Sequence, residues 1–591
     1  MNKRILSLII IILVLTSPLY CVNLNKQYSY NSKEYQTVLK LAILSGVALP
    51  SSSTPVSGYE LLLALNRINV ENLPKFASDL YKDVYSNISE HDVFYKDDIF
   101  QFDLNPSIGL EAYVQTSNET WISSNDWVLP YKKRLKLIDL PVEIGIKDYF
   151  YGVAVPEISV QFNQPNLTPG KTREENQFAK IFSYNADISL GLQRSMPFIA
   201  EAVLGNNNIH FFIGRDSQSL GHGYTGNLIL GDNFLYQDFA KLSIHSKVFS
   251  FNYSITYFDR QKNTKITDNY SAFDSTQLEN FTFSGRHQIR VMSNYQITVF
   301  DKATISFNFG NLFDSDSGFD LRLLNPFMIT HNYFNFTTFN NNYYNEGAAL
   351  EANNHFSASL SLPIVKGWSI YSELMIDQMQ LIGEKSSTST EPPNAIGLLL
   401  NITNSTILRD GILTSYIEGV YTSPNLYLNE KYIDNTGKIS NEKEDNSEYY
   451  YWNQDLIVGN SVWWGNDLSY SGYINGPDSI VLSLGSEYEK DQYKIKGIFT
   501  YKIHGEQGIR WHERQNPTIH YTDSVWNLAL TGVWEHTFIG EVQLYYNITN
   551  YVSVTANVAG IYRINNRNEL GAHWQDMQLS IGVRFFPMKC F

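Results

Sequence analysis

Apolar and polar residues alternate along most of the chain in pieces of strand length. One piece runs over 251–257, where Phe, Tyr and Ile alternate with Asn, Ser and Thr, and another over 552–558, where Val and Ala alternate with Ser, Thr and Asn. Successive side chains of a strand point to opposite faces, so each piece has one apolar and one polar face. The apolar face is either the core of a soluble sandwich or the lipid-facing surface of a membrane barrel.

The same pattern recurs over most of the chain after residue 100. Further alternating pieces lie at 108–115, 153–161, 208–213, 296–309, 356–362 and 541–546. Short connectors rich in Asn, Gly and Asp separate many of them, and longer polar inserts lie at 385–391 and 432–448. Short turns at one end and long loops at the other are typical of bacterial outer-membrane barrels.

The length of this region sets the number of strands. About 490 residues follow residue 100, and a spanning strand takes roughly 9–11 residues. Bacterial single-chain barrels have even strand numbers, so roughly 16–18 strands fit once loops are included. A propeller or an array of sandwiches would show an internal repeat, and we find none. We therefore predict an all-β transmembrane protein with a large antiparallel outer-membrane barrel over 101–591.

The last alternating piece resembles a barrel-closing strand. Apolar residues occupy every second position from Met577 to Phe585, and the sequence finishes on Phe591. Pro587 cannot donate a hydrogen bond to a strand ladder. We expect this strand to pair with the first one and to end near Phe586. An edge strand of a soluble sheet is the alternative.

The first 22 residues read as an export signal. Lys3 and Arg4 precede a short apolar run over 5–15, which is the pattern of a cleavable signal peptide. Cys21 raises the possibility of lipid attachment, which the bulky Tyr20 before it disfavours.

Residues 23–100 differ from the rest because their pattern is helical. Apolar residues over 38–44 follow helical spacing and Gly46 stands where a helix would end. Ser57 and Glu60 form a capping box before the apolar run 61–65. A third helical pattern covers 73–85. We predict a small periplasmic helical bundle, with a single helix lying on the membrane surface as the alternative.

Composition narrows the possible functions. The chain has a formal net charge of −15, and only two of its 591 residues are cysteine. A negative balance argues against nucleic-acid binding, and two distant cysteines form no disulfide framework. Mean hydropathy is −0.24, which argues against a helical membrane protein. Aromatic residues make up 14%, as expected both for membrane interfaces and for carbohydrate sites.

Motifs for catalysis or metal binding are missing from the sequence. Gly170-Lys171-Thr172 resembles the end of a phosphate-binding loop, but Pro165 stands where that motif requires glycine. The sequence has no GxSxG elbow and no zinc-type His/Cys spacing. We therefore predict a non-enzymatic protein without metal or cofactor.

Three segments are dense in polar residues and glycine. Segment 214–228 is expected to be either a glycine-kinked turn or a fold-in toward the lumen. On the polar faces of the second and third segments, carboxylates opposite arginines would neutralise buried charge. The candidate residues are Arg215, His222, Tyr224 and Asn227 in the first segment, Arg286, His287, Arg290, Asn325, His331 and Asn332 in the second, and Glu373 and Asp377 in the third.

In order along the chain, these segments resemble the Wzi-type capsule assembly family of bacterial outer membranes. Thr54-Pro55, the stretch from Gly214-Arg215 to Gly221-His222-Gly223, Asn325-Pro326, the strand with Glu373 and Asp377, and Gly476-Pro477-Asp478 carry the resemblance. Leu220 and His222 depart from the family, which has Trp and Pro at these positions. The resemblance implies a barrel with a periplasmic helical bundle, an occluded lumen and a lectin-like, non-enzymatic role in organising surface polysaccharide. Asp478 joins the candidate residues on this ground.

The expected function is therefore the binding of surface (capsular) polysaccharide at the bacterial outer membrane. Aromatic residues of extracellular loops would stack on sugar rings, and an interface girdle is the alternative role for them. Expected partners are the polysaccharide, outer-membrane lipid and the barrel-assembly machinery, with no nucleic acid and a monomeric barrel. A porin or substrate-specific channel is the alternative function. The stacking candidates are Tyr450, Tyr451, Trp452, Trp463 and Trp464.

Overall fold

The structure is a computed structural model of the chain. It describes residues 23–89, 93–97, 99–116, 128, 135–158, 199–234, 236–258, 287–315, 324–326, 352–378, 394–427, 429–433, 439–440, 448–452, 457–462, 465–506 and 528–587.

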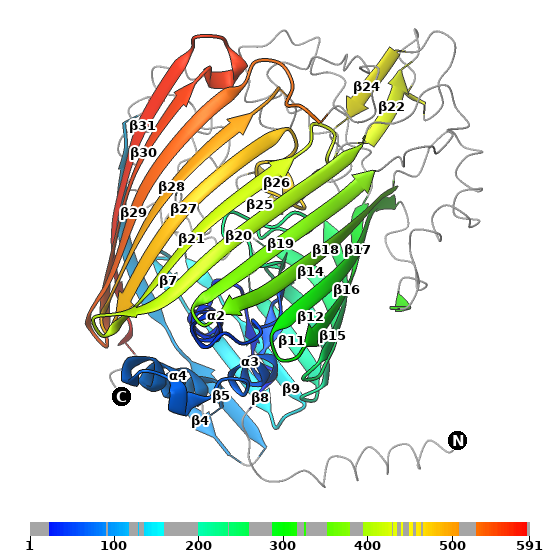
Figure 1. Ribbon diagram of the computed structural model, residues 1–591. Helices are drawn as coiled ribbons and strands as arrows, with labels where there is room; N and C mark the ends of the chain where they lie inside the picture. Colours follow the sequence, from blue (N-terminus) through cyan, green and yellow to red (C-terminus); the bar gives the residue numbers. More distant parts are fainter. Residues whose placement is uncertain are drawn as a thin grey trace, which may run out of the picture.

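In this part of the chain, one antiparallel sheet of 22 strand segments closes on itself (Figure 1). Its segments are β4 (Tyr95–Lys96), β5 (Phe100–Leu104), β6 (Ser107–Gln115), β7 (Ile138–Asp139), β8 (Val142–Ile146), β9 (Phe150–Ala154), β10 (Glu157–Ile158), β11 (Ala200–Gly205), β12 (Ile209–Asp216), β14 (Gln237–His245), β15 (Phe249–Phe258), β16 (His287–Val299), β17 (Ala303–Ser315), β18 (Ala352–Val365), β19 (Trp368–Gln378), β20 (Ala395–Leu408), β21 (Gly411–Thr422), β27 (Ser479–Lys490), β28 (Tyr493–His504), β29 (Glu535–Thr549), β30 (Val552–Ile564) and β31 (His573–Phe585).

Three prolines break long strands of this sheet into pairs of segments. Pro106 separates β5 from β6, Pro141 separates β7 from β8, and Pro156 separates β9 from β10. Proline lacks the N–H that a ladder needs, so each segment ends there although pairing continues on both sides. With these pairs joined and the two-residue β4 set aside, the 22 segments form 18 barrel strands among the described residues. The predicted barrel and its strand range are confirmed.

The barrel closes between its last and first strands. β31 pairs with β6 over eight residues, from Gln578 opposite Gln115 to Phe585 opposite Ile108. The strand ends at Phe585, and the Phe586 N–H donates to the Tyr551 carbonyl at 2.9 Å. The sequence-based prediction for the closing strand is confirmed.

The two ends of the barrel differ. Connections of two or three residues join β14 to β15, β16 to β17, β18 to β19, β20 to β21, β27 to β28 and β29 to β30 at one end. The connections at the other end are mostly longer, and β22 (Asn429–Ile433) and β24 (Glu448–Trp452) lie there (Figure 1). Bacterial barrels have short turns on the periplasmic side and long loops outside, so the short-turn end is the periplasmic one.

Polar side chains face the inside of the barrel and apolar side chains face outward. On β27, Ser483 is 1% exposed, whereas its neighbours Leu482 and Leu484 are 39% and 41% exposed. A soluble β-protein buries its apolar face, so this inverted arrangement is that of a barrel in hydrocarbon.

A ladder of amide and hydroxyl side chains crosses the inner wall. Asn252 contacts Ser243 at 2.8 Å and Asn294 at 3.0 Å, and Asn308 contacts Asn294 at 2.6 Å and Ser357 at 2.8 Å. These residues lie opposite one another in the register of β14 to β18. Each buried amide therefore finds a partner on the next strand.

Aromatic residues stand near both ends of the outer face. Tyr493 and Tyr546 lie opposite each other near the short turns, and Tyr501 and Phe538 stack at 4.8 Å near the other end. Eight residues separate the two levels on β28, or roughly 26 Å along the strand. After allowance for strand tilt, this spacing approaches the apolar band of roughly 25 Å expected between aromatic girdles.

No helix among the described residues is both long enough and apolar enough to cross a membrane.

The outer face offers a direct test. Leu400 on β20 is 52% exposed and points outward, while Asn401 next to it is buried. We expect Leu400→Arg to lower the free energy of unfolding in lipid vesicles by about 2–3 kcal/mol, because a cation would enter hydrocarbon. Urea titration measures this change. Leu400→Ile should be nearly neutral, and an equally mild effect of arginine would contradict the outward assignment.

Three helices form a small bundle before the barrel. They are α2 (Lys33–Ser45), α3 (Gly58–Leu65) and α4 (Lys75–Ser89). Gly46 ends α2 in a left-handed conformation with φ 69°, and the Ser57–Glu60 capping box begins α3. Both predicted features are confirmed. Tyr35, Leu41, Leu61 and Leu65 are fully buried among the apolar residues that the helices share.

Two single-turn 3-10 helices, η1 (Val70–Asn72) and η8 (Asn566–Asn568), and several further short strands lie outside the barrel sheet. These strands are β1 (Gln27–Tyr28), β2 (Ser53–Thr54), β3 (Val56–Ser57), β13 (Ser219–Leu220), β23 (Ile439–Ser440), β25 (Ile457–Val462) and β26 (Gly465–Tyr470).

Candidate functional site: a lumen filled by inward segments

The helical bundle is inserted into the periplasmic end of the barrel. Helix α2 contacts the inner side of β19 and β20, and α2 and α3 lie at the barrel opening in Figure 1. Between these helices, β2 pairs with β13, and the Ala48 N–H donates to the Asp301 carbonyl at 2.8 Å. At the end of α2, the Gly367 N–H of the β18–β19 turn donates to the Ile43 carbonyl at 2.9 Å. We call residues 23–89 the plug.

A buried lysine ties the plug to one side of the barrel. The Lys40 ammonium on α2 contacts the carboxylates of Glu487 and Glu489 on β27. Burial alone would lower the pKa of Lys40, but the two carboxylates outweigh that effect and raise it. The ammonium is therefore charged at neutral pH.

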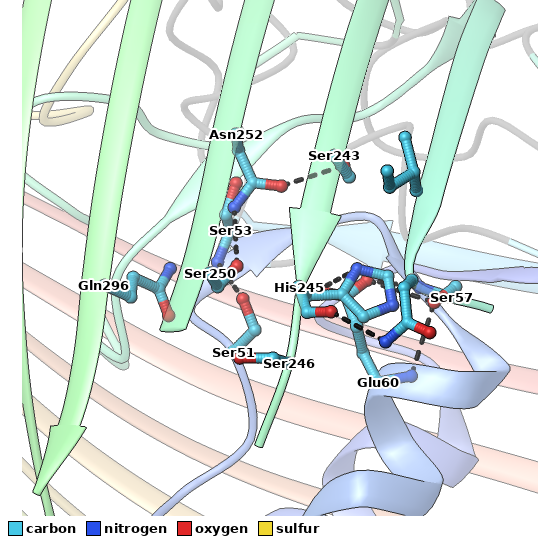
Figure 2. Close-up of polar contacts among 12 residues, drawn as sticks. Ser51, Ser53, Ser57, Glu60, Ser243, His245, Ser246, Ser250, Asn252 and Gln296 are labelled. Carbon is cyan, nitrogen blue, oxygen red and sulfur yellow. Dashed lines mark hydrogen bonds and ion pairs between the residues drawn. The ribbon is translucent and has the colours of Figure 1, made fainter. Parts of the chain in front are cut away.

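A carboxylate of the plug, Glu60, lies beside His245 of the barrel wall, as Figure 2 shows. One oxygen of Glu60 accepts from the Ser57 N–H at 2.9 Å, and the other lies 3.9 Å from His245 Nδ1 on β14. Burial alone would raise the pKa of Glu60, but His245, His210 and Lys241 together lower it. Close by, Lys241 donates at 2.8 Å to plug carbonyls of Ser53 and Pro55.

The connection between β12 and β14 folds into the lumen and meets Glu418 on β21. The N–H groups of Tyr224 and Thr225 each donate to the Glu418 carboxylate at 2.7 Å. The Thr225 hydroxyl and the Asn401 amide add bonds of 2.5 and 3.0 Å. Glu418 is fully buried, so its charge is stabilised by these four donors. We call residues 217–236 the inward loop.

A second carboxylate holds the inward loop four residues later. The N–H groups of Leu228 and Ile229 donate to Glu373 on β19 at 3.0 and 3.1 Å. Gly223 lies just before the first attachment point and allows the chain to bend tightly there, because a Cβ on it would overlap the Gly226 carbonyl oxygen.

Two tyrosines from the long-loop side cover the inward loop. The Tyr427 hydroxyl donates to the Leu228 carbonyl at 2.6 Å and accepts from the Tyr473 N–H at 3.0 Å. Tyr473 in turn contacts the Thr225 hydroxyl at 3.0 Å. Both tyrosines are fully buried, which places a layer of side chains above the loop.

His222 joins the three parts that meet in the lumen. Its ring lies 3.2 Å from the Pro50 carbonyl of the plug and 3.2 Å from the Ser361 hydroxyl of β18. A neutral ring satisfies both contacts, donating to the carbonyl and accepting from the hydroxyl. The plug, the inward loop and the wall thus form one packed unit.

The protonation of His222 yields a pH prediction. Burial lowers the pKa of His222 to about 4, against the opposing effect of the Pro50 carbonyl. Between its unfolded pKa of about 6.5 and its folded pKa, the unfolded chain binds a proton that the folded chain does not, so stability falls as pH falls. We expect a loss of about 2 kcal/mol between pH 7 and pH 5.

Urea titration at several pH values measures this dependence. His222→Gln keeps a donor and an acceptor but does not titrate, so its stability curve should be flatter by that amount. If the free energy of unfolding changed with pH equally in the variant and the wild type, His222 would not be the source of the pH dependence.

The expected pairing of Glu373 with an arginine is wrong. Arg290 is fully buried, and its guanidinium donates to Gln237 at 2.7 Å and to Thr256 at 3.1 Å. Glu373 is satisfied instead by main-chain N–H groups. Strand alternation predicts that a residue faces inward, but it does not identify its partner.

The lumen assignment of Arg215 is also wrong. Arg215 shares the outward side of β12 with Phe211 and Ile213. It makes two 2.7 Å bonds to Asp238 and lies 3.9 Å from the centre of the Tyr236 ring.

The remaining candidates are distributed over the structure. Tyr224 stacks on Tyr416 at 3.9 Å, and Asn227 bonds to the Gly223 N–H at 2.8 Å, so both lie in the inward loop as the fold-in interpretation expects. Asp377 accepts from the Tyr427 N–H at 2.9 Å, and Asp478 accepts from the Thr531 N–H at 3.0 Å. Asn325 is exposed.

Several candidates cannot be placed among the described side chains. His287 lies in β16, and Tyr450, Tyr451 and Trp452 lie in β24, where only the backbone is described. Outside the described residues lie the signal segment 1–22, Arg286, His331, Asn332, Trp463 and Trp464.

Sequence reasoning did not single out Glu418 or Lys40. Glu418 stands between Ile417 and Gly419 in an apolar strand, and such an isolated inward carboxylate is a usable signal of a buried attachment point. Lys40 lies on a face of α2 that is buried only because the barrel wall covers it, and no pattern within the helix sequence indicates this burial.

The comparisons with known proteins concern the fold. The sequence matches no family model, and no curated protein matches it. Wzi of Escherichia coli, described as an outer-membrane protein involved in group 1 capsule assembly and a carbohydrate-binding β-barrel, matches in structure with a TM-score of 0.53. The alignment covers 95% of this chain and 99% of Wzi at 11% identity. The two chains share the outer-membrane barrel fold.

Outer-membrane channels also align, at lower scores. DcaP of Acinetobacter baumannii aligns over 84% of this chain and 99% of its own, at 8% identity and a TM-score of 0.35. OccK5 (OpdH) of Pseudomonas aeruginosa aligns over the same shares at 9% identity and a TM-score of 0.36. At these TM-scores, the two structural similarities support no conclusion about this chain.

Proposed function

We propose that this protein binds or organises surface polysaccharide at the bacterial outer membrane in a lectin-like, non-enzymatic role. The observation that carries the proposal is the filled lumen, in which Glu373, Glu418 and His222 hold main-chain segments across the barrel. A barrel whose interior is packed with its own chain offers its outer surface and loops for function rather than a pore. The fold shared with a carbohydrate-binding barrel supports the choice of ligand.

The proposed binding surface is the long-loop end. β22 and β24 pair beyond the barrel wall at that end (Figure 1), and Tyr450, Tyr451 and Trp452 belong to β24. Aromatic rings stack on the apolar faces of sugars, and Trp463 and Trp464 follow in the same stretch of sequence. A girdle role for these aromatic residues is the competing proposal.

The partners of this proposed role are the polysaccharide and the membrane itself. We propose that the outward apolar face contacts outer-membrane lipid and that the barrel-assembly machinery inserts the barrel. We propose a monomer exported by a cleavable signal peptide.

Affinity measurement with purified surface polysaccharide tests the proposal. The folded barrel in detergent should retain the glycan of its own organism, and Trp452→Ala should weaken binding about fivefold through loss of one stacked ring. Tyr546→Ala, near the periplasmic end, is the matched control and should bind as wild type. A barrel that retains no surface glycan would contradict the proposal.

The alternative proposal is a channel, and conductance separates the two. A filled lumen predicts no steady ion current in planar bilayers, whereas a porin or substrate-specific channel predicts one. Steady current from the wild-type barrel would favour the channel.

A further inference from the structure

An apolar groove lies on the outer face of the barrel, separate from the filled lumen. Its volume is about 920 Å³, and its wall runs from β17 across β18, β19, β20, β21 and β27 to β28. Two cavities between the plug and the inner wall are far smaller, at about 30 and 10 Å³. A closed barrel is convex outside, so a hollow of this size needs a local cause.

The groove follows one row of the hydrogen-bond register. Its residues lie directly opposite one another on successive strands, in the order Ile305, Leu360, Ser372, Leu400, Gly419, Leu482 and Tyr501. Six strand spacings give a length of roughly 29 Å. Because barrel strands are tilted, the row runs obliquely between the periplasmic and extracellular sides.

Small residues make the hollow. The row contains Ser372 and Gly419 between large aliphatic neighbours, and Ala358 lies in the next row. A Cβ added to Gly419 would find no atom within 4 Å. Leu398 and Leu400 stand beside this floor at 47% and 52% exposure and form one side of the groove.

The surroundings define the chemistry of the occupant. The outward side chains of the groove are aliphatic apart from Ser372, Tyr421 and Tyr501, and none is charged. Gly419 is three residues from the extracellular end of β21 and eight from its periplasmic end. The Gly419 part of the floor therefore lies in the outer-leaflet half of the lipid-facing band, and Ser372, four residues from the periplasmic end of β19 and six from its other end, lies near the middle of that band. Both parts are continuous with the surface that already contacts hydrocarbon.

We propose that this groove seats an acyl chain of lipopolysaccharide from the outer leaflet. Its volume lies within the range of roughly 300–1,000 Å³ that binds small molecules selectively, and its long, narrow, uncharged form fits a hydrocarbon chain. The groove adds a specific lipid site to a surface that otherwise contacts lipid without preference. The proposal is independent of polysaccharide binding.

Native mass spectrometry of the intact barrel tests this site. The protein is reconstituted in vesicles of phosphatidylethanolamine and phosphatidylglycerol with lipopolysaccharide, and then released into mild detergent. The wild type should retain lipopolysaccharide, and Gly419→Leu, which fills the floor, should reduce its occupancy about tenfold. Ser372→Leu fills the same row from another strand and should act alike, so the test does not depend on the folding of one variant.

Gly540 provides the matched control. A Cβ added to Gly540 would also find no atom within 4 Å, but this residue does not line the groove. Gly540→Leu should retain lipopolysaccharide as wild type does. Retention of phospholipid only, equal loss in all three variants, or a dimer that Gly419→Leu abolishes would each overturn the assignment.

Discussion

Glu418→Ala is expected to lower the free energy of unfolding by about 4 kcal/mol and to open the barrel to ions. The variant leaves the N–H groups of Tyr224 and Thr225, the Thr225 hydroxyl and the Asn401 amide without their common acceptor. Each buried donor left unpaired costs about 1–3 kcal/mol, less where water enters. The inward loop then loses one of its two carboxylate attachments, so steady current should appear in planar bilayers.

Two comparisons make this result interpretable. Ser415→Ala on the same strand removes only an exposed hydroxyl contact of 2.9 Å with Ser486 and should change neither stability nor current. Glu418→Gln keeps one acceptor oxygen and should fall between alanine and wild type. If Glu418→Ala were as stable as the wild type and passed no steady current, Glu418 would not be what holds the inward loop.

Lys40→Met is expected to lower the free energy of unfolding by about 3 kcal/mol. The Lys40 side chain is 7% exposed and neutralises two carboxylates whose side chains are 15% and 23% exposed. Removing one partner of a buried ion pair leaves uncompensated charge, which costs about 3–5 kcal/mol. We take the lower end because Glu487 and Glu489 retain some contact with water. Urea titration in lipid vesicles measures the change.

Lys494 offers the matched control for this effect. It also pairs with Glu487, at 3.1 Å, but its side chain is 39% exposed. Exposed ion pairs contribute about 0–1 kcal/mol, so Lys494→Met should be nearly neutral. Similar losses of unfolding free energy in both variants would mean that the contribution of Lys40 does not depend on its burial inside the barrel.

Strand alternation is enough to predict the barrel because it is a local property. The pattern around 577–585 predicted the closing strand and its end, and the spacing of Ser57 and Glu60 predicted the start of α3. In both cases the residues that decide the structure lie within one strand or one helical turn. The strand breaks at Pro106, Pro141 and Pro156 are not local in this sense, because pairing on both sides of each break depends on strands elsewhere in the chain.

The contacts inside the lumen could not be predicted in the same way. Glu373 and Arg290 both face inward as expected, yet their partners come from residues 228–229 and from Gln237 and Thr256. The partners of Glu373 are main-chain N–H groups of a folded-in loop, and the pattern of side chains along the sequence cannot predict them. For Arg215, the sequence motif suggested a lumen position, but the strand parity set by Phe211 and Ile213 places it outside.

Collision accessibility of spin labels along β27 tests the central claim, that the apolar side of the strands meets hydrocarbon. Single nitroxide labels are placed at each position from 480 to 484 in vesicle-embedded protein, and relaxation by oxygen and by a water-soluble nickel reagent is compared. The account predicts high oxygen and low nickel access at 480, 482 and 484, with low oxygen access at 481 and 483. Access without a two-residue period, or with nickel favoured at 480, 482 and 484, would contradict it.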